Sequence, residues 1–173
     1  MAKQSLIKLA ALSGVPFIMV LGNSMLIPAF PMMEQALGIT QLQVGLTITL
    51  FSIPAGITIP ILGFISDKIG RKKVIVPALI VYAIGGLISG AAPLLLSDPY
   101  IMLLVGRVVQ GIGAAGTGPI AMALVSDIFK GNERSKALGI IEAANGVGKI
   151  ISPIVGALVA MVKWYALFLF LQF

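Results

Sequence analysis

Residues 63–73 read GFISDKIGRKK, and this polar stretch separates two long runs of sequence that contain no charged residue. The run between Glu34 and Asp67 has 32 residues, and the run between Lys73 and Asp98 has 24. A helix needs about 20 predominantly apolar residues to cross the hydrocarbon core of a membrane. The sequence therefore predicts a charged loop at the membrane surface, flanked by two membrane-spanning helices.

The same pattern continues in both directions, and charged residues mark the membrane surfaces. We predict an all-α polytopic membrane protein with a single transmembrane domain over residues 1–173. The segment 35–44 is expected to be a loop, because it contains glycine, threonine and several glutamines. The helices are expected near residues 8–31, 44–65, 74–95, 100–125 and 137–161, with a partial sixth helix from Trp164.

The composition excludes several classes of protein. Hydrophobic residues make up 58% of the sequence and charged residues 10%, against about 45–50% and about 25% in soluble domains. Cysteine and histidine are absent, which removes disulfides, a Ser-His pair and the usual nitrogen and sulfur ligands of zinc. We therefore expect no enzyme, no metal site and no cofactor.

Lysine and arginine are concentrated at one side of the predicted membrane. Nine of the 12 basic residues fall at the N-terminus and in the loops near 68–73 and 130–136, and only Lys163 falls opposite. The positive-inside rule then predicts a cytoplasmic N-terminus, and the expected location is the cell membrane, as a multi-pass protein of the bacterial inner membrane. A nucleic-acid surface is the competing explanation of the net charge of +6, but topology accounts for it. The lipid bilayer, and no nucleic acid, is the expected partner.

The loop of residues 63–73 also carries a specific motif. Gly63 would let another helix approach closely, Asp67 could cap a helix end or pair with a base, and Gly70 permits a tight turn. The basic residues that complete the motif are Lys68, Arg71 and Lys72. The resulting spacing G-x-x-x-D-K-x-G-R-K resembles the loop 2–3 signature of the major facilitator superfamily, in which this loop is a cytoplasmic latch. The resemblance implies that Arg71 pairs with Asp127; a solvated surface acid is the alternative.

Three further segments resemble the same family and occur in the expected order. The first predicted helix contains Leu21-Gly22 and then Pro28 and Pro31, similar to the L-G-x5-P-x-x-P pattern of the family's twelve-helix drug:proton antiporters. The fourth predicted helix reads RVVQGIGAAG from residue 107, similar to R-x-x-Q-G-x-G-A-A. The fifth reads GKIISPIVGA from residue 148, similar to G-x-x-x-G-P-x-x-G-G with small residues at two glycine positions. The resemblance implies the N-terminal six-helix half of a major facilitator fold, with the sixth helix truncated.

Within these segments, small residues are expected to serve helix packing and bending. The candidates are Gly111, Gly113, Gly148, Ser152, Pro153 and Gly156. Residues 111–116 also match the dinucleotide pattern G-x-G-x-x-G, but that pattern requires a preceding strand, and here it falls inside a predicted membrane span.

Ionisable and polar residues inside the spans are candidates for proton coupling or for a substrate cavity. Arg107 and Gln110 are expected at the cavity, where Arg107 would bias proton release; the alternative is that Arg107 snorkels or pairs with backbone carbonyls. Glu142, Asn145 and Lys149 share one helical face because they are three and four residues apart. An orienting salt bridge and a solvated Glu142 remain alternatives.

Two residues of the first predicted helix are candidates for the substrate cavity. Asn23 is expected to face the cavity or to form a hydrogen bond with a neighbouring helix. Met25 is a second candidate, because methionine surfaces adapt to varied ligands.

The resemblance implies a secondary active transporter, and the antiporter-like segments favour proton-coupled multidrug or small-molecule efflux. Proton-coupled nutrient uptake is one alternative. A truncated or split gene product without transport activity of its own is another. The expected partners are a small-molecule substrate, protons and a C-terminal six-helix half.

Overall fold

The computed structural model describes residues 3–170, and all regular structure within that range is helical. The elements are α1 Lys3–Ser24, η1 Ile27–Ala29, α2 Phe30–Leu37, α3 Gln41–Ile69, α4 Arg71–Leu95, α5 Tyr100–Ala115, α6 Gly118–Ile128, α7 Asn132–Val162 and α8 Ala166–Phe170.

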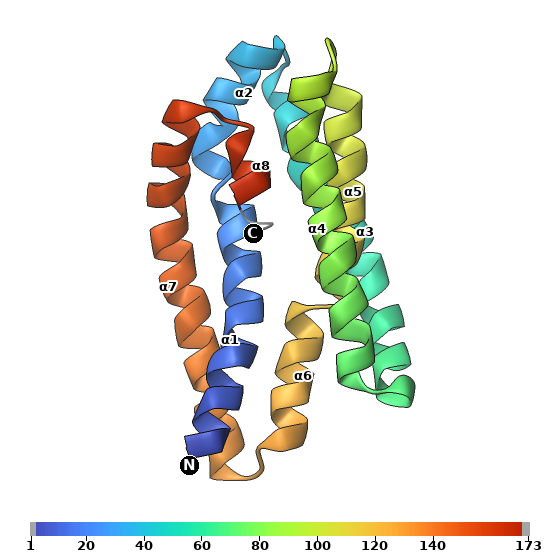
Figure 1. The fold of residues 1–173 in the computed structure, drawn as a ribbon, viewed down its shortest axis with the longest axis vertical. Helices are drawn as coiled ribbons and strands as arrows, with labels where there is room; N and C mark the ends of the chain where they lie inside the picture. The colour runs from blue at the N-terminus through green and yellow to red at the C-terminus, as the bar shows by residue number, and fades with distance from the viewer. Residues whose placement is uncertain (1–2, 171–173) are drawn as a thin grey trace.

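The helices run side by side along the long axis of the molecule, as Figure 1 shows. In the described part of the chain, five stretches of 25 to 30 residues are long and apolar enough to cross a membrane. They are Leu12–Leu37, Gln41–Ile69, Arg71–Leu95, Tyr100–Ile128 and Asn132–Met161. The predicted all-α architecture with five full spans is confirmed.

The connection between the first two spans is much shorter than the predicted loop over 35–44. Helix α2 continues to Leu37, and α3 already begins at Gln41. Gly38 ends α2 in the left-handed region, at φ 62°. Thr40 then caps α3 in a capping box with Gln43, which satisfies backbone N–H groups at the start of the helix. The polar residues that suggested a loop therefore end one helix and start the next.

The fourth span is interrupted, which the sequence reading did not anticipate. Helix α5 ends at Ala115 and α6 begins at Gly118. Between them, the Thr117 hydroxyl donates to the carbonyl of Ala114 at 2.8 Å and contacts the Met19 sulfur at 2.6 Å. Pro119 at the start of α6 has no N–H to continue the ladder of α5.

Glycines bring the helices α3, α4 and α5 into backbone contact. A Cβ at Gly111 would meet the backbone of Phe51 in α3, and one at Gly113 would meet the backbone of Tyr82 in α4. On the other side of the molecule, α7 packs along α1. A Cβ at Gly148 would meet the Phe17 ring, and one at Gly156 would meet the backbone of Met25, just beyond α1. Close contacts of this kind are those expected of small residues in helix packing.

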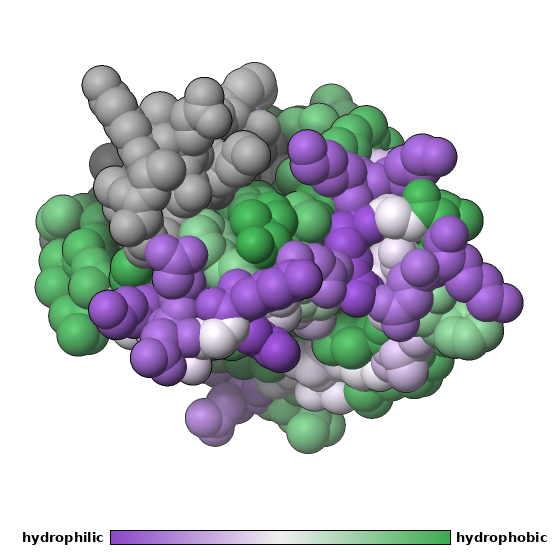
Figure 2. Space-filling view, turned by 90° about the horizontal axis from the view of Figure 1, so that it is seen from below, coloured by the Kyte–Doolittle hydropathy of each residue, from purple (hydrophilic) through white to green (hydrophobic). Residues whose placement is uncertain are grey.

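One end of the molecule carries the basic loops. The N-terminal end of α1, the α3–α4 turn and the α6–α7 turn all lie at the lower end of Figure 1. Figure 2 looks onto this end and shows hydrophilic groups across much of it, with apolar groups between and around them. The exposed basic residues of these turns are Lys68, Lys72, Lys73, Lys130, Arg134 and Lys136. We refer to this surface as the basic end.

Candidate functional site

Arg107 lies in the interior of the molecule and is 1% exposed. Its position on α5 places it between α1 and α3. The guanidinium donates from Nε to the Thr47 carbonyl at 3.0 Å, from Nη1 to Gln110 Oε1 at 2.8 Å and from Nη2 to Asn23 Oδ1 at 3.0 Å. It also lies 4.4 Å from the ring centroid of Phe51. One charged side chain therefore links three helices.

Within the described residues, Arg107 forms no ion pair with a carboxylate; its hydrogen-bond acceptors are two amides and a carbonyl. Because a buried charge is stabilised mainly by its partners, these three hydrogen bonds help to hold the cation inside the helix bundle. The alternative prediction that Arg107 binds backbone carbonyls is right for Thr47. Asn23 was expected to face the cavity or to form a hydrogen bond with a neighbouring helix. Its Oδ1 atom accepts a hydrogen bond from Arg107 of α5.

A cavity of about 320 Å³ lies beside this cluster, between the α1–α7 pair and the helices α3, α5 and α6. Asn23 and Phe51, which both contact Arg107, form part of its wall. Arg107 and Gln110 do not line it, so the prediction that they face the cavity is wrong. The arginine lies one layer behind the wall, because its side chain is drawn to acceptors on α1 and α3.

Lys149 of α7 is the single charged residue among those that line this cavity in the described chain. The remaining wall is mostly apolar, with Asn23 and Ser24 as its polar members. This combination suits a ligand that has an apolar body and a negatively charged or strongly polar group, because Lys149, whose side chain is exposed, offers a positive charge beside an apolar wall.

The predicted face of Glu142, Asn145 and Lys149 is only partly a cavity wall. Lys149 lines the cavity, whereas Glu142 is exposed and does not. Asn145 is half-buried, and its Oδ1 atom is buried without a hydrogen-bond partner. Glu142 and Lys149 are seven residues apart, so they differ by only about 20° around the helix but by about 10 Å along it, and only Lys149 lies at the depth of the cavity.

Met25 does not line the cavity, and that prediction is wrong. Its side chain is 1% exposed and belongs to a packed cluster with Leu26, Met33 and Leu103. A Cβ at Gly156 would lie 2.5 Å from the Met25 carbonyl oxygen, so α7 closes over this part of the chain.

The predicted packing residues of α7 face α1. Ser152 is fully buried, and its hydroxyl donates to the Leu21 carbonyl at 2.8 Å. Gly148 would place a Cβ 3.2 Å from the Phe17 ring. Pro153 is half-buried within α7, which continues as one helix from Asn132 to Val162; the bend predicted at Pro153 stays a prediction.

A second arginine cluster lies at the basic end. Arg71, at the start of α4, contacts Asp127 at 3.0 Å and forms an ion pair with Asp67. Its Nη1 also donates to Ser66 Oγ at 2.7 Å. The predicted contact between Arg71 and Asp127 is therefore present, and it joins the ends of α3, α4 and α6.

The glycines of this loop have different uses. Gly70 has φ 100°, a conformation that favours glycine, and it allows α4 to begin directly after α3. A Cβ at Gly63 would meet nothing within 4 Å, so the predicted close helix approach there is wrong. Lys68 lies over the Phe64 ring at 4.3 Å, and Lys72 is exposed.

Sequence reasoning did not anticipate Thr47, Phe51, Ser66 and Thr117 as members of these clusters. Thr47 contributes a backbone carbonyl, which no side-chain pattern can indicate. Ser66 directly precedes Asp67 in the motif of residues 63–73, and this position was the one feature of the sequence that could have indicated its contact with Arg71. Among the described residues, no group of histidine, cysteine, aspartate or glutamate could hold a metal ion.

The family model described as Major Facilitator Superfamily matches residues 12–172. The chain is 51% identical over 160 residues to the bacillibactin exporter of Bacillus subtilis (strain 168), which covers 91% of this chain and 40% of that protein. It is 32% identical over 158 residues to multidrug resistance protein 2 of the same organism, covering 91% and 38%. It is 33% identical over 125 residues to the class C tetracycline resistance protein of Escherichia coli, covering 72% and 30%. The chain thus spans well under half the length of these relatives.

Proposed function

Because the chain belongs to the major facilitator superfamily, whose members are transporters and not enzymes, we propose that it is the N-terminal part of a proton-coupled exporter of small molecules. Relatives that are named as an exporter and as drug-resistance proteins support export rather than uptake. In the complete transporter, a second six-helix half would close the open side of the cavity. The bacterial inner membrane, with the basic end in the cytoplasm, is the proposed location.

The observation that carries this proposal is the cavity beside the Arg107 cluster. Its wall is apolar apart from a few polar groups, and Lys149 supplies a positive charge. Arg107 holds Asn23 in that wall through the bond to Asn23 Oδ1, so it acts as a positioning residue. Bacillibactin is the first compound to test, because a relative that is 51% identical to this chain is its exporter.

The cluster of Arg71, Asp67 and Asp127 is proposed as the cytoplasmic gate. It ties three helix ends together at the basic end, on the side from which an exported substrate would enter. Breaking the contacts with Asp127 would free α6 from the α3–α4 turn. An exposed ion-pair network suits this role, because such pairs stabilise by less than about 1 kcal/mol and can be broken at little cost.

Transport should be measured in inverted membrane vesicles that contain the product of the full gene. An inside-acid pH gradient should drive bacillibactin into these vesicles, and collapse of the gradient should stop it. Entry driven by an outside-acid gradient would indicate nutrient uptake in symport instead. No gradient-dependent movement of bacillibactin or of unrelated amphipathic drugs would count against the exporter proposal.

Lys149→Gln removes the positive charge of the cavity and keeps a polar side chain. We expect a fivefold or greater rise in the apparent KM for a negatively charged substrate and little change for a neutral one, since one ion pair at a partly hydrated site is worth about 1 kcal/mol or more. Lys130→Gln, at the basic end, is the matched control. Equal effects on charged and neutral substrates would contradict a direct role of Lys149.

A further inference from the structure

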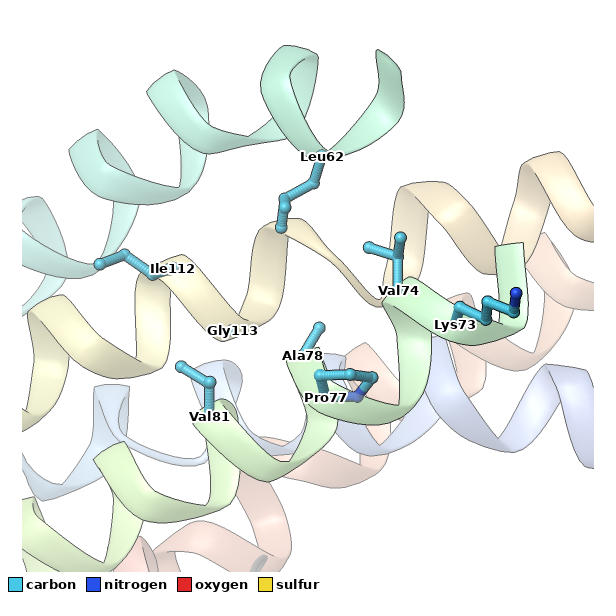
Figure 3. Close-up of a pocket in the computed structure, with 8 residues that line it drawn as sticks. All are labelled: Leu62, Lys73, Val74, Pro77, Ala78, Val81, Ile112 and Gly113. Atoms are coloured by element: carbon cyan, nitrogen blue, oxygen red, sulfur yellow. The ribbon is translucent and has the colours of Figure 1, made fainter. Parts of the chain in front are cut away.

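A second cavity, of about 250 Å³, lies between α3, α4 and α5, outside the cluster of Arg107. Figure 3 shows it, with Leu62 from α3, Ile112 from α5 and Val74, Pro77 and Val81 from α4 around it. Every lining residue is apolar except Lys73, which lies at one end of the lining. We call this cavity the α3–α4–α5 groove.

The shape of the groove favours a chain over a compact solute. Its lining on α4 extends from Lys73 to Val81, which corresponds to about 12 Å along a helix at about 1.5 Å per residue. Its volume is below the roughly 300–1,000 Å³ of pockets that enclose drug-sized ligands. An apolar space of this length and volume accommodates a segment of hydrocarbon chain.

The surroundings of the groove are those of a membrane-facing surface. Ile61 of α3 and Val76 and Ile80 of α4, which do not line the groove, are 54% to 57% exposed. Ile112, which does line it, is 40% exposed. Side chains of this kind face hydrocarbon in a chain that spans a membrane, so acyl chains have direct access to the groove.

The positive charge of Lys73 at the end of the groove favours a ligand that carries a negative charge at one end. Lys73 lies in the first turn of α4, at the basic end, and is exposed. The neighbouring Arg71 is already engaged by Asp67 and Asp127, whereas Lys73 forms no ion pair within the described residues. Basic residues at the mouth of a pocket between spanning helices attract anionic lipid headgroups.

We propose that the α3–α4–α5 groove binds one acyl chain of an anionic phospholipid, with the headgroup phosphate on Lys73. The site is separate from the substrate cavity and does not depend on the transported compound or on the direction of transport. It lies between the two helices that carry the gate residues Asp67 and Arg71, so its occupancy would brace the α3–α4 pair.

The test uses a single tryptophan as a reporter of neighbouring lipid. In a background of the full protein in which every native tryptophan, Trp164 included, is replaced by phenylalanine, Ile112→Trp places the reporter in the groove, and Val76→Trp places a matched reporter on the outer surface of α4. Each protein is reconstituted in phosphatidylcholine vesicles that contain increasing amounts of phosphatidylglycerol. The acyl chains of the phosphatidylglycerol are brominated, so they quench the fluorescence of a tryptophan that they contact. We expect about a fivefold preference for phosphatidylglycerol over brominated phosphatidylcholine at residue 112, and none at residue 76.

Adding Lys73→Gln should abolish the preference at residue 112, whereas Lys130→Gln should leave it unchanged. Equal preference at both reporters, or a preference that survives Lys73→Gln, would overturn the proposal. A reporter at residue 112 that no brominated lipid quenches would show that protein covers the groove, and would overturn it as well. If Ile112→Trp does not fold, native mass spectrometry can compare the unmodified protein with Lys73→Gln. The amount of phosphatidylglycerol that stays bound should fall at least threefold in the variant. Equal amounts of bound phosphatidylglycerol in the two proteins would refute the site.

Discussion

Arg71 and Arg107 are both arginines that join three helices, but they do so in opposite environments. Arg71 is 20% exposed and contacts two carboxylates and a hydroxyl. Arg107 is 1% exposed and bonds only to amide and carbonyl oxygens in the described contacts. A charge near water can be paired with mobile acids and released again, whereas a charge in the interior needs a complete and fixed set of acceptors. The difference suggests a movable contact at the basic end and a rigid one in the interior.

The largest effect is expected from Arg107→Ala. It removes three hydrogen bonds from a charged group, each worth about 1.5–3 kcal/mol, and frees Asn23 in the cavity wall. Transport should fall to background while the protein still inserts into the membrane. Vesicle transport, normalised to protein amount, measures this change.

Arg107→Lys is the informative companion, because it keeps the charge but cannot form the same three bonds. We expect it to retain less than about a tenth of the transport rate, a loss that corresponds to about 1.4 kcal/mol or more. Full activity in Arg107→Lys would mean that charge alone matters, and the contrast with Arg71 would lose its basis.

A change at the basic end should alter transport more than stability. Arg71→Asp places a third carboxylate beside Asp67 and Asp127, and we expect transport to fall at least tenfold. Because the contacts are partly exposed, the free energy of unfolding should change by only about 1 kcal/mol. Transport in vesicles and the thermal unfolding midpoint in detergent measure the two effects.

The double variant Arg71→Asp with Asp127→Arg restores opposite charges in exchanged positions and should recover part of the transport. Complete absence of recovery, with normal amounts of protein in the membrane, would argue that the pair is structural and does not form a gate.

The smallest effect is expected from Ser152→Ala, which removes one neutral hydrogen bond to the Leu21 carbonyl. Interhelical hydrogen bonds in membranes contribute about 0.6 kcal/mol on average. The unfolding midpoint should therefore fall slightly and transport should persist. A loss of transport as large as that of Arg107→Ala would show that the α1–α7 contact is as critical as the arginine cluster.

Several members of the two arginine clusters could be predicted from the sequence. Asp67, Arg71 and Asp127 follow from a motif whose residues meet at one membrane surface, and Arg107 was recognisable as a charge inside a span. Met25 could not be placed correctly, because burial within a helix pair and exposure to a cavity give the same local pattern of apolar residues. The break between α5 and α6 was missed for a related reason: a run of small residues is compatible with both a continuous helix and an interrupted one.

The sequence by itself determined that the chain is built of helices long and apolar enough to cross a membrane, which end carries the positive charge, and which arginine falls inside such a helix. These follow from hydropathy and charge, which act on each segment independently of its neighbours. Only the tertiary structure decided that Arg107 lies behind the cavity wall, that Lys149 faces the cavity while Glu142 does not, and that Lys73 ends an apolar groove. Such placements depend on how far each helix is rotated and how closely glycines let the backbones approach, and no single segment encodes that.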